Sequence, residues 1–437
     1  MKKKLFFLAA AFTAFVGASA AHIEINDTLR FSEIYPATIH RYMITVPDGY
    51  DGSGEAALYV GLDGVLCNAP AVMDTLMAEG VLPTTVGVFL QPGYVPGADG
   101  VLRYNRSNEF DATDGRFARF LEKELLPAVQ GRTLSDGRTI RLSADPADHM
   151  IFGLSSGGIA AFNAAWQRPD LFGKVYSGCG TFVPMRGGNE LEAIVRKHEP
   201  KPLRIFLQDG FTDTWNPIFG SWYEHNRMLA SALEFAGYDC AFDWAEGGHS
   251  VVRTSAIFPD VMRWMWRPDT VAENTGNGLL AKILIAGAGW EAVDLPSVPA
   301  RTGRAVYPDS TFIAETVEAS NWLTQTLLAP DGTPHATQRF YWLHSYDNDP
   351  VGPSGMAFDA DGYLWVATRD GIQICDQNGR VRAIIALPAD VDGTAAAIEI
   401  GDGAVTIVDI ATGRAYSRHF NVASPAPGVR PRSQGAA

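Results

Sequence analysis

The sequence predicts an α/β fold, a mostly parallel sheet with helices on both faces, followed by a smaller all-β domain. Between about Ile39 and Trp266, short apolar runs alternate with amphipathic stretches, which indicates strands and helices in alternation. Most of these runs lack the polar alternation of a half-exposed strand, as is typical of parallel strands. Beyond Pro268 the segments are shorter and are separated by Asp-Gly and Asn-Gly turns, which predicts antiparallel hairpins.

Six apolar runs are the predicted strands of the first part. Five have the continuous apolar character of strands buried on both faces, at residues 56–63, 84–91, 149–153, 174–180 and 203–208. The sixth, residues 238–246, alternates apolar and polar residues as a half-exposed strand does.

Two amphipathic segments between these strands are predicted helices. In segment 111–129 the apolar side chains on one helical face are Phe117, Phe120, Leu121 and Leu125. Segment 221–237 has similar spacing and ends in Gly237, which favours a helix stop. Its apolar residues are Met228, Leu229, Ala232, Leu233 and Ala236.

Residues 1–20 have the parts of a secretory signal peptide. Three lysines precede an apolar run from Leu5 to Val16, and Ala18-Ser19-Ala20 has the small-x-small form of a cleavage site. The apolar run is too short to span a bilayer. We therefore expect an exported protein, periplasmic or extracellular, without membrane attachment after cleavage.

Composition limits the partners of the chain. Its 437 residues are 46% hydrophobic and 19% charged, which is typical of folded domains, and the net charge is −14. So acidic a chain lacks the basic surface that nucleic acid or anionic lipid requires, and neither is expected as a partner.

The four cysteines are Cys67, Cys179, Cys240 and Cys375. Export permits disulfides between them, but the sequence does not predict which would pair. None of the four has the C-x-x-C spacing of a zinc site, so the cysteines do not predict one.

Changes in composition divide the chain into segments after the signal peptide. The predicted α/β domain covers residues 21–268, and the turn-rich stretch 269–294 is predicted as a linker. Residues 295–420 form the predicted all-β domain. Residues 421–437 are rich in proline, glycine and serine and are predicted to be a disordered tail.

Ser155 lies in the pentapeptide Gly153-Leu154-Ser155-Ser156-Gly157, between a predicted strand and a predicted helix. A G-x-S-x-G match alone arises easily in a glycine-rich chain, but this junction is the context of the nucleophile elbow of α/β-hydrolases. Small neighbours let the backbone make the sharp turn that exposes the serine oxygen. The sequence therefore predicts an α/β-hydrolase fold with Ser155 as the nucleophile.

A serine nucleophile needs a base, which in this fold follows the acid in chain order. His249 lies on a glycine-rich loop directly after the strand 238–246. His198 and His225 lie within amphipathic segments and are better explained as surface or packing residues. His249 is therefore the predicted base.

The acid is expected in the loop that follows the strand 203–208. Asp209 begins the turn at once, where an aspartate often bonds only its own backbone. Asp213 lies deeper in the loop and can reach across to the histidine, so it is the preferred acid. Asp209 and Glu224 remain the alternatives.

Backbone N–H groups are the predicted donors to a developing oxyanion. The first is the N–H of Ser156, at the start of the predicted helix. The second is expected in the loop after the strand 56–63, where Gly64 and Val65 are the candidates.

From about Tyr42 to Met265 the chain resembles the esterase family that includes enterochelin esterases, feruloyl esterases and acetylxylan esterases of carbohydrate esterase family one. The resemblance runs in order through DG (63–64), RSNEFD (106–111), FARFLEKELLPAV (117–129), GLSSGG (153–158), QDGFTDTW (208–215), EFAGYD (234–239) and EGGHS (246–250). It implies a Ser-His-Asp triad at the positions Ser155, His249 and Asp213, without a metal. RSNEFD departs from the RSxEYD form of the family, which leaves open any role of the missing tyrosine hydroxyl.

The C-terminal part carries a second resemblance. Residues 355–387 read as four strands joined by two Asp-Gly turns and one Asn-Gly turn, the pattern of a propeller blade. Residues 353–381 are similar to a blade of the senescence-marker and gluconolactonase family, whose members bind a divalent metal. The remaining length suffices for about three blades, so we expect a partial propeller without lactonase activity. Asp359 and Asp361 are interpreted as turn residues and not as metal ligands.

These features predict a serine esterase that acts on a small-molecule or oligosaccharide ester, with feruloyl or acetyl esters of carbohydrate as the expected substrates. Trp215 and Trp222, close after the predicted acid, are candidate substrate contacts or core residues. Glu109 is either an ion-pair partner of Arg106 or a substrate contact. The alternatives are an esterase of catecholate siderophores, which an acidic chain disfavours, a catalytically silent carbohydrate-binding protein, and a metal-dependent lactonase.

Overall fold

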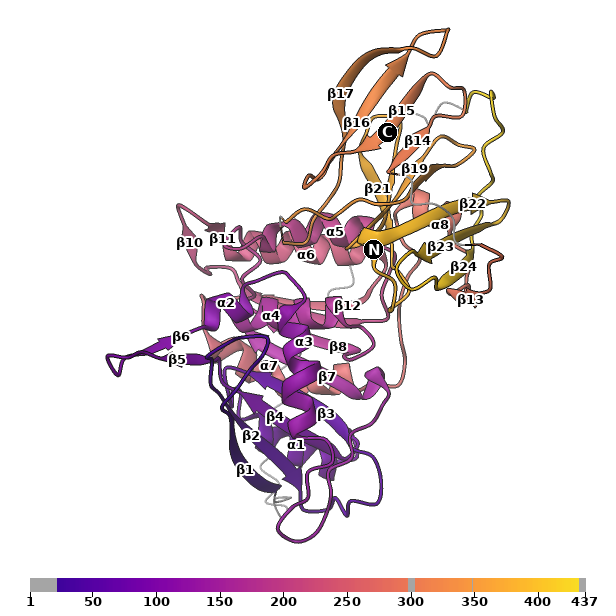
Figure 1. The fold of residues 1–437 in the computed structure, drawn as a ribbon. Coiled ribbons are helices and arrows are strands. Elements are labelled where there is room, and N and C mark those ends of the chain that lie inside the picture. The colour runs from indigo at the N-terminus through magenta and orange to yellow at the C-terminus, as the bar shows by residue number, and fades with distance from the viewer. Residues whose placement is uncertain (1–21, 298–302, 348, 432–437) are drawn as a thin grey trace. The chain divides into compact units, whose positions relative to one another are not determined.

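A computed structural model describes residues 22–297, 303–347 and 349–431 (Figure 1). The predicted signal peptide lies outside these residues. The chain divides into two compact units, and each is described here by itself. The first consists of the chain up to residue 192 together with residues 201–273, and the second of residues 193–200 and the chain from residue 274 onward.

The first unit contains an eight-stranded sheet in the order β1-β2-β4-β3-β7-β8-β9-β12. β1 and β2 run antiparallel to their neighbours, and the strands from β4 to β12 in this order are parallel. The strands are β1 (His22–Leu29), β2 (His40–Pro47), β3 (Ala57–Leu62), β4 (Thr85–Leu90), β7 (His149–Leu154), β8 (Lys174–Gly178), β9 (Arg204–Gly210) and β12 (Asp239–Ala245). All six predicted strands are present, and β1 and β2 were not predicted.

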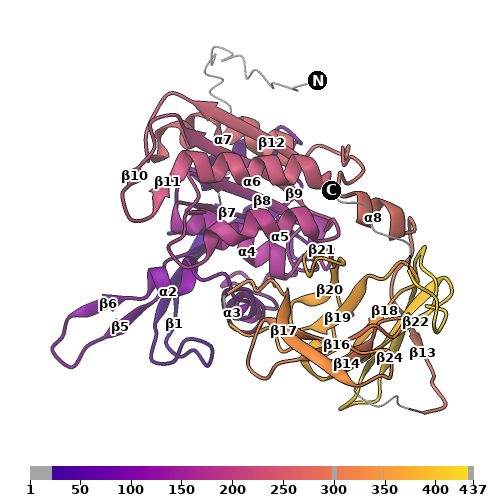
Figure 2. The ribbon, with the colours of Figure 1, turned by 90° about the horizontal axis from the view of Figure 1, so that it is seen from above.

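Helices cover both faces of this sheet, seen from above in Figure 2. On one face, aromatic side chains such as Tyr59, Phe152 and Tyr176 form a core with apolar residues of α1 and α7. Because side chains alternate along a strand, the other face is left for α4 and α6, which contact β7, β8, β9 and β12. The helices of this unit are α1 (Ala69–Ala78), α2 (Arg106–Phe110), α3 (Arg116–Phe120), α4 (Ser156–Gln167), α6 (Trp222–Ala236) and α7 (Val251–Met265). This architecture confirms the predicted α/β-hydrolase fold.

The two predicted helices are found with small differences. In the first, α3 continues into a π-helical turn at Leu121–Leu125 and a 3-10 turn at Leu126–Ala128. α6 ends at Gly237 in the left-handed conformation, φ 82°, which glycine adopts without strain. Met228 is 46% exposed, so its predicted place on the buried face of α6 is wrong.

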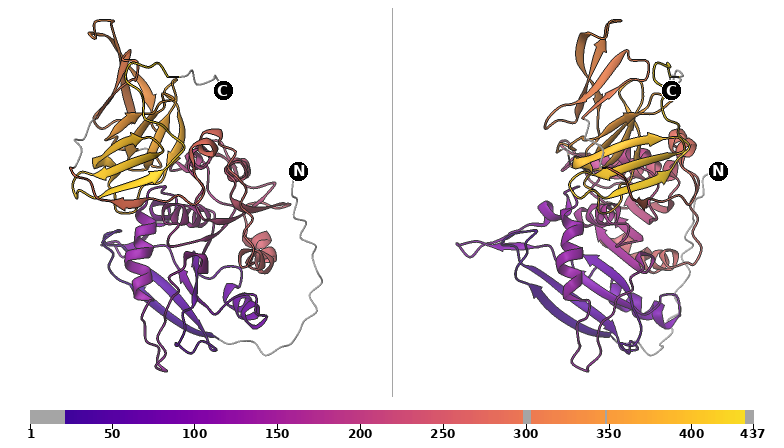
Figure 3. Two further views of the ribbon diagram at one scale, coloured as in Figure 1. Left: turned by 90° about the vertical axis from the view of Figure 1, so that its right-hand side faces the viewer. Right: turned by 45° about the vertical axis from the view of Figure 1, so that its right-hand side comes forward.

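Three four-stranded antiparallel sheets make up most of the second unit, drawn in orange to yellow in Figure 3. Their orders are β14-β15-β16-β17, β18-β19-β20-β21 and β13-β24-β23-β22. The strands are β13 (Glu291–Val293), β14 (Arg304–Val306), β15 (Phe312–Thr316), β16 (Trp322–Leu328), β17 (Pro334–Trp342), β18 (Met356–Phe358), β19 (Leu364–Thr368), β20 (Gly371–Cys375), β21 (Val381–Ile385), β22 (Ala396–Gly401), β23 (Ala404–Asp409) and β24 (Ala415–His419). This agrees with the predicted all-β class of the C-terminal part, and its relation to a propeller stays a prediction.

The segments expected to be linker and tail contain ordered structure where they are described. Residues 269–294 include α8 (Gly278–Ile283) and β13, and Leu280 and Ile283 of α8 are buried in the core of the second unit. After β24, the N–H of Asn421 donates to the carbonyl of Ile283 at 2.8 Å, and Val422 packs on the same core. Apolar anchors among turn-forming residues explain why composition alone missed this structure.

All four cysteines lie within the described residues and are free thiols. Among the helices of residues 22–297, 303–347 and 349–431, none is long and apolar enough to cross a bilayer.

A buried ion pair links β9 to β12 at their amino ends. Arg204 Nε donates to Asp239 Oδ2 at 2.8 Å, and the same guanidinium donates to the carbonyl oxygens of Met265 and Arg267 at 2.7 Å. Arg204 is 8% exposed and Asp239 is 4% exposed. Removing the carboxylate alone leaves a buried charge without its counterion, which is costly.

We therefore expect Asp239→Ala to lower the free energy of unfolding by about 3–5 kcal/mol, measured by urea denaturation. Asp136→Ala is the control, because it removes an aspartate that pairs with Arg138 at the surface, and it should leave the urea midpoint nearly unchanged. Equal midpoints for the two variants would contradict a structural role of the pair.

Candidate active site

Ser155 occupies a strained turn between β7 and α4. Its backbone angles are φ 57° and ψ −122°, outside the regions that a residue with a side chain normally adopts. The N–H of Ser155 donates to the carbonyl of Gly178 at 2.9 Å, and its carbonyl accepts from Thr181 N–H at 3.1 Å. These bonds to the last residue of β8 and to the segment after it hold the turn in place. Strain of this kind is stored preferentially at functional sites.

The side chains of Ser155, His249 and Asp213 form one hydrogen-bonded line. His249 Nε2 lies 2.8 Å from Ser155 Oγ, and Nδ1 lies 2.8 Å and 3.1 Å from the two carboxylate oxygens of Asp213. With Nδ1–H donating to the carboxylate, the Nε2 lone pair faces the serine hydroxyl. The Asp213 side chain is fully buried, whereas the imidazole is 30% exposed. The line therefore runs from the interior to a serine that solvent can reach.

Topology explains why these residues meet. Ser155 follows β7, Asp213 follows β9 and His249 follows β12, and these strands are parallel members of one sheet. The carboxyl ends of parallel strands lie at one edge, where sites in open α/β sheets are built. Of the three candidate acids, Asp213 is the one that contacts the imidazole.

Asp209 and Asp213 differ in the electrostatic environment of their carboxyl groups. Burial would raise the pKa of Asp213, but hydrogen bonds from His249, Asp209 and the Thr214 N–H lower it below its ordinary value. Burial, together with the hydrogen bond and charge of Asp213, raises the pKa of Asp209 to about 9. Asp213 is therefore the more readily ionised carboxyl group of the two.

The predicted oxyanion donors fall into two groups. Ser156 is the first residue of α4, so its N–H has no acceptor within the helix and stays a candidate. The N–H of Gly64 donates to the carbonyl of Leu90 at 2.9 Å, which removes Gly64 from the candidate donors. Val65, in the same loop after β3, remains the second candidate.

The two predicted tryptophans have different environments. Trp222 is 7% exposed, its ring centroid lies 6.1 Å from that of His249, and its Nε1–H donates to Thr181 Oγ1 at 3.2 Å. Thr181 Oγ1 lies 3.3 Å from Ser155 Oγ. Trp215 begins the short hairpin of β10 (Trp215–Asn216) and β11 (Gly220–Ser221) and is 70% exposed, so it is not a core residue.

The predictions for Glu109 are wrong. Its side chain is fully buried and accepts hydrogen bonds from His40 Nε2, Gly93 N–H and Asn105 Nδ2, each at 3.0 Å. It therefore neither pairs with Arg106 nor lies where a substrate could contact it. It joins the start of β2 to the segment that follows β4.

Arg106 pairs instead with Asp63, a contact that was not predicted. Its Nε and Nη2 donate to the two oxygens of Asp63 at 2.7 Å each, the bidentate geometry that guanidinium and carboxylate favour. A Cβ on Gly157 would lie 2.9 Å from Asp63 Oδ2, so this pair lies directly against the start of α4. The signal was present in the sequence, because Asp63 ends a predicted strand at the same sheet edge as Ser155.

An open hollow of about 630 Å³ adjoins the loop after β3 in the first unit. Gly64 and Val65 form one wall, and the other walls come from β1, β2 and the end of β4. Their side chains are mostly polar: Asn26, Asp27, Thr28, Arg41, Tyr42, Met43, Phe89 and Gln91. The hollow offers hydrogen-bonding groups next to the candidate oxyanion loop.

One group of side chains near Ser155 has the composition of a metal site. Cys179, Asp213 and His249 offer ligand atoms that lie within 4.8 Å of one another. A metal there would displace the hydrogen bond between Asp213 and His249. In addition, burial and the charges of Asp213 and Asp209 raise the pKa of the Cys179 thiol well above its ordinary value, which opposes the thiolate that metals require. The donor set therefore suits the hydrogen-bonded line better than an ion.

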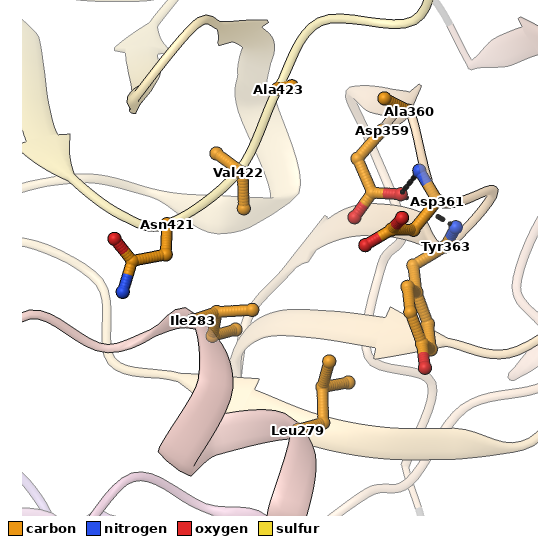
Figure 4. A pocket seen from close by; sticks show the side chains of 9 residues that line it. All are labelled: Leu279, Ile283, Asp359, Ala360, Asp361, Tyr363, Asn421, Val422 and Ala423. Atoms are coloured by element: carbon orange, nitrogen blue, oxygen red, sulfur yellow. Dashed lines mark hydrogen bonds between the residues drawn. The ribbon is translucent and has the colours of Figure 1, made fainter.

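A smaller hollow, of about 270 Å³, lies in the second unit between α8, the turn after β18 and the segment after β24 (Figure 4). Asp359 Oδ1 accepts from the N–H groups of Asp361 and Tyr363 at 3.0 and 2.9 Å, and Oδ2 accepts from Trp365 Nε1 at 2.9 Å. Through these bonds the carboxylate of Asp359 stabilises the turn in which it lies.

Comparison with known proteins agrees with the fold and the class of enzyme. The sequence model of the family described as "Putative esterase" matches residues 38–260, just over half of the chain. The chain belongs to this esterase family, and it is a carboxylic ester hydrolase. No curated protein matched the sequence.

Solved structures to which the chain is similar include a ferulic acid esterase, which is 19% identical. The match covers 56% of this chain and 98% of that protein, with a TM-score of 0.43. The enterobactin esterase of Shigella flexneri, solved in the presence of enterobactin, is 23% identical. The match covers 57% of this chain and 59% of that protein, with a TM-score of 0.44. The ferric enterobactin esterase of Salmonella typhimurium is 22% identical. The match covers 56% of this chain and 58% of that protein, with a TM-score of 0.44. The chain thus spans about three fifths of these two enterobactin esterases.

Close packing at the Ser155 turn leaves no room for a side chain at Gly153. A Cβ there would lie 2.2 Å from the carbonyl oxygen of Gly157, a backbone atom. We expect Gly153→Ala to lower the free energy of unfolding by about 1–3 kcal/mol and to slow ester hydrolysis, because the turn must shift. Gly54→Ala, where a Cβ meets nothing within 4 Å, should change neither urea unfolding nor hydrolysis. A Gly153→Ala protein with native stability and rate would show that the turn tolerates the shift.

Proposed function

We propose that this esterase uses Ser155, His249 and Asp213 as a catalytic triad and hydrolyses its substrate through an acyl-enzyme. His249 Nε2 takes the hydroxyl proton as Ser155 Oγ attacks the ester carbonyl, and Asp213 stabilises the imidazolium that forms. The N–H of Ser156, with that of Val65, binds the oxyanion. Collapse of the tetrahedral intermediate passes the proton to the leaving alcohol. Water, deprotonated by His249, then releases the acid.

One observation carries this proposal. The imidazole lies 2.8 Å from Ser155 Oγ and 2.8 Å from Asp213 Oδ1, so nucleophile, base and orienting acid are all within hydrogen-bonding distance. The strained φ of Ser155 adds support, because an ordinary turn serine has no need of it. A catalytically silent binding protein would have no reason to retain either feature.

For the substrate we propose an ester of a carbohydrate, with an acetyl or feruloyl group as the acid. The hollow beside Gly64 and Val65 carries polar side chains, among them Asn26 and Gln91, that suit the hydroxyl groups of a sugar. The exposed Trp215 offers a face for stacking on a sugar or an aryl group. A catecholate siderophore is anionic and would favour free cations. Arg106, at the same sheet edge, is already neutralised by Asp63, and the chain is acidic overall.

Replacement of the nucleophile tests the reaction. We expect Ser155→Ala to lower kcat for p-nitrophenyl acetate and methyl ferulate by at least about 10³-fold, as removal of a triad member does. Ser53→Ala, in the loop after β2, should turn over as the wild type does. The kcat/KM values of the wild type for p-nitrophenyl acetate and p-nitrophenyl ferulate, which share a leaving group, then rank the acetyl and feruloyl acyl groups. Undiminished turnover by Ser155→Ala would exclude Ser155 as the nucleophile.

We also propose that the protein is exported, since Lys2–Lys4, the apolar run 5–16 and Ala18-Ser19-Ala20 have the pattern of a cleaved signal. Expression of the full chain in a Gram-negative host should yield a periplasmic or secreted protein. Its mass should correspond to an N-terminus at Ala21. A cytoplasmic product that retains Met1 or Lys2 would contradict export.

A further inference from the structure

Thr181 is a buried residue beside the nucleophile, and the reaction described above gives its hydroxyl group no role. It lies three residues after the end of β8 and is 2% exposed. Its N–H donates to the carbonyl of Ser155 at 3.1 Å, and its Oγ1 lies 3.3 Å from Ser155 Oγ. Two separate contacts therefore join Thr181 to the residue that attacks the ester.

The other partners of the two hydroxyl groups decide which of them donates. Trp222 Nε1–H can only donate and lies 3.2 Å from Thr181 Oγ1, so this oxygen accepts the indole bond and keeps its own proton for another group. Within the part of the chain that the structure describes, Ser155 Oγ is the one acceptor for that proton. With the Nδ1–H of His249 on Asp213, Ser155 gives its own proton to Nε2 at 2.8 Å. Thr181 is therefore the donor and Ser155 Oγ the acceptor.

On the basis of the triad proposed above, we propose that the Thr181 hydroxyl is a second hydrogen-bonding group on the nucleophilic oxygen, and that Trp222 is the positioning residue that holds it there. The donated bonds then form a chain from Trp222 through Thr181 and Ser155 to His249, in which each bond polarises the next hydroxyl. The Trp222 ring also packs edge-on against the imidazole, with 6.1 Å between the ring centroids. Trp222 thus contacts both the base and the group behind the nucleophile.

Trp222 is itself held in place by the backbone around it. It is the first residue of α6, it is 7% exposed, and its N–H donates to the carbonyl of Thr214 at 3.1 Å. Asn226, one turn further along α6, donates from Nδ2 to the carbonyls of Trp222 and Gly180 at 3.0 and 2.8 Å. The start of α6 and the segment after β8 are thereby joined next to the indole bond, so the Thr181 hydroxyl has little freedom to turn away from the nucleophile.

A donor at this position acts in both halves of the reaction. As Ser155 Oγ bonds to the ester carbonyl carbon, its proton passes to His249 Nε2, and the Thr181 O–H stabilises the negative charge that develops on Oγ. In the second half the bond between Oγ and the acyl carbon breaks, and Oγ takes the proton that His249 has removed from water. Thr181 keeps its own proton throughout. Its hydrogen bond is therefore strongest in the transition states and does not contribute to substrate binding.

Replacement of the hydroxyl tests this role. We expect Thr181→Val, which has nearly the same shape, to lower kcat and kcat/KM for p-nitrophenyl acetate equally, by about 10-fold, with KM unchanged. Labelling of Ser155 by a fluorophosphonate, which requires the attack alone, should slow by the same factor. Thr181→Ser keeps a hydroxyl and should restore kcat to within a few-fold of the wild type.

Thr368→Val is the matched control. Thr368, at the end of β19 in the second unit, is fully buried, and its Oγ1 donates to the carbonyl of Gly371 at 2.7 Å. Loss of this buried hydroxyl should lower Tm and leave kcat unchanged. The comparison separates the loss of any buried threonine hydroxyl from the loss of the one beside Ser155.

A purely structural role would be to satisfy the buried N–H of Trp222, since a buried indole usually has a hydrogen-bond partner. Thr181→Val should lower Tm, because it leaves that N–H without an acceptor, but it should not lower Tm further in Trp222→Phe, which has no such N–H. The rate is the readout that this structural role does not move. The double variant should be at least as slow as Thr181→Val alone, although the loss of Tm caused by the missing hydroxyl is gone.

The outcomes are distinct. The proposal is overturned if Thr181→Val is as fast as the wild type in turnover and labelling, if Thr181→Ser is as slow as Thr181→Val, or if the double variant regains the wild-type kcat. Ser155→Ala supplies the background rate. Undiminished turnover by Ser155→Ala would refute the triad itself, whereas an inactive Ser155→Ala beside a fully active Thr181→Val would refute the role of Thr181 alone.

Discussion

The left-handed backbone at Ser155 is the constraint on which the rest of the site depends. A residue with a side chain accepts φ 57° only where its surroundings hold it there. Here the holding groups are backbone atoms of Gly178, at the end of β8, and of Thr181, just after it. The turn closes so tightly that a Cβ at Gly153 would collide with the backbone of Gly157. The same geometry places the serine at the amino end of α4, whose first N–H groups have no acceptor within the helix.

The sheet brings the other groups to that turn. Asp209, Asp213 and His249 reside on or after neighbouring parallel strands, so separations of 36 and 94 residues along the chain become hydrogen bonds at one edge. The site holds the carboxyl groups of Asp209 and Asp213, the imidazole of His249 and the hydroxyl of Ser155. The Arg106–Asp63 pair packs against α4 and contributes no free charge.

Sequence reasoning predicted the parallel strands and the line of Ser155, Asp213 and His249 because continuous apolar runs and chain order carry that information. It missed β1 and β2, whose alternation is interrupted, and it misplaced Glu109, since a buried glutamate on His40 has no local signature. Gly64 illustrates a different limit. Whether the N–H of a loop residue is free to bind an oxyanion depends on which residue lies opposite it in the fold. For Gly64 that residue is Leu90 at the end of β4, and no pattern in the loop sequence indicates this.

The central claim, that Ser155 is an activated nucleophile, is tested most directly by peptide mass mapping after reaction with a fluorophosphonate. A serine aligned with His249 attacks phosphorus and keeps the phosphonyl group, whereas other serines lack the base to do so. The account predicts one stoichiometric adduct, on the peptide that contains Ser155, and none in His249→Ala. An unlabelled protein, or a label on another residue, would contradict it.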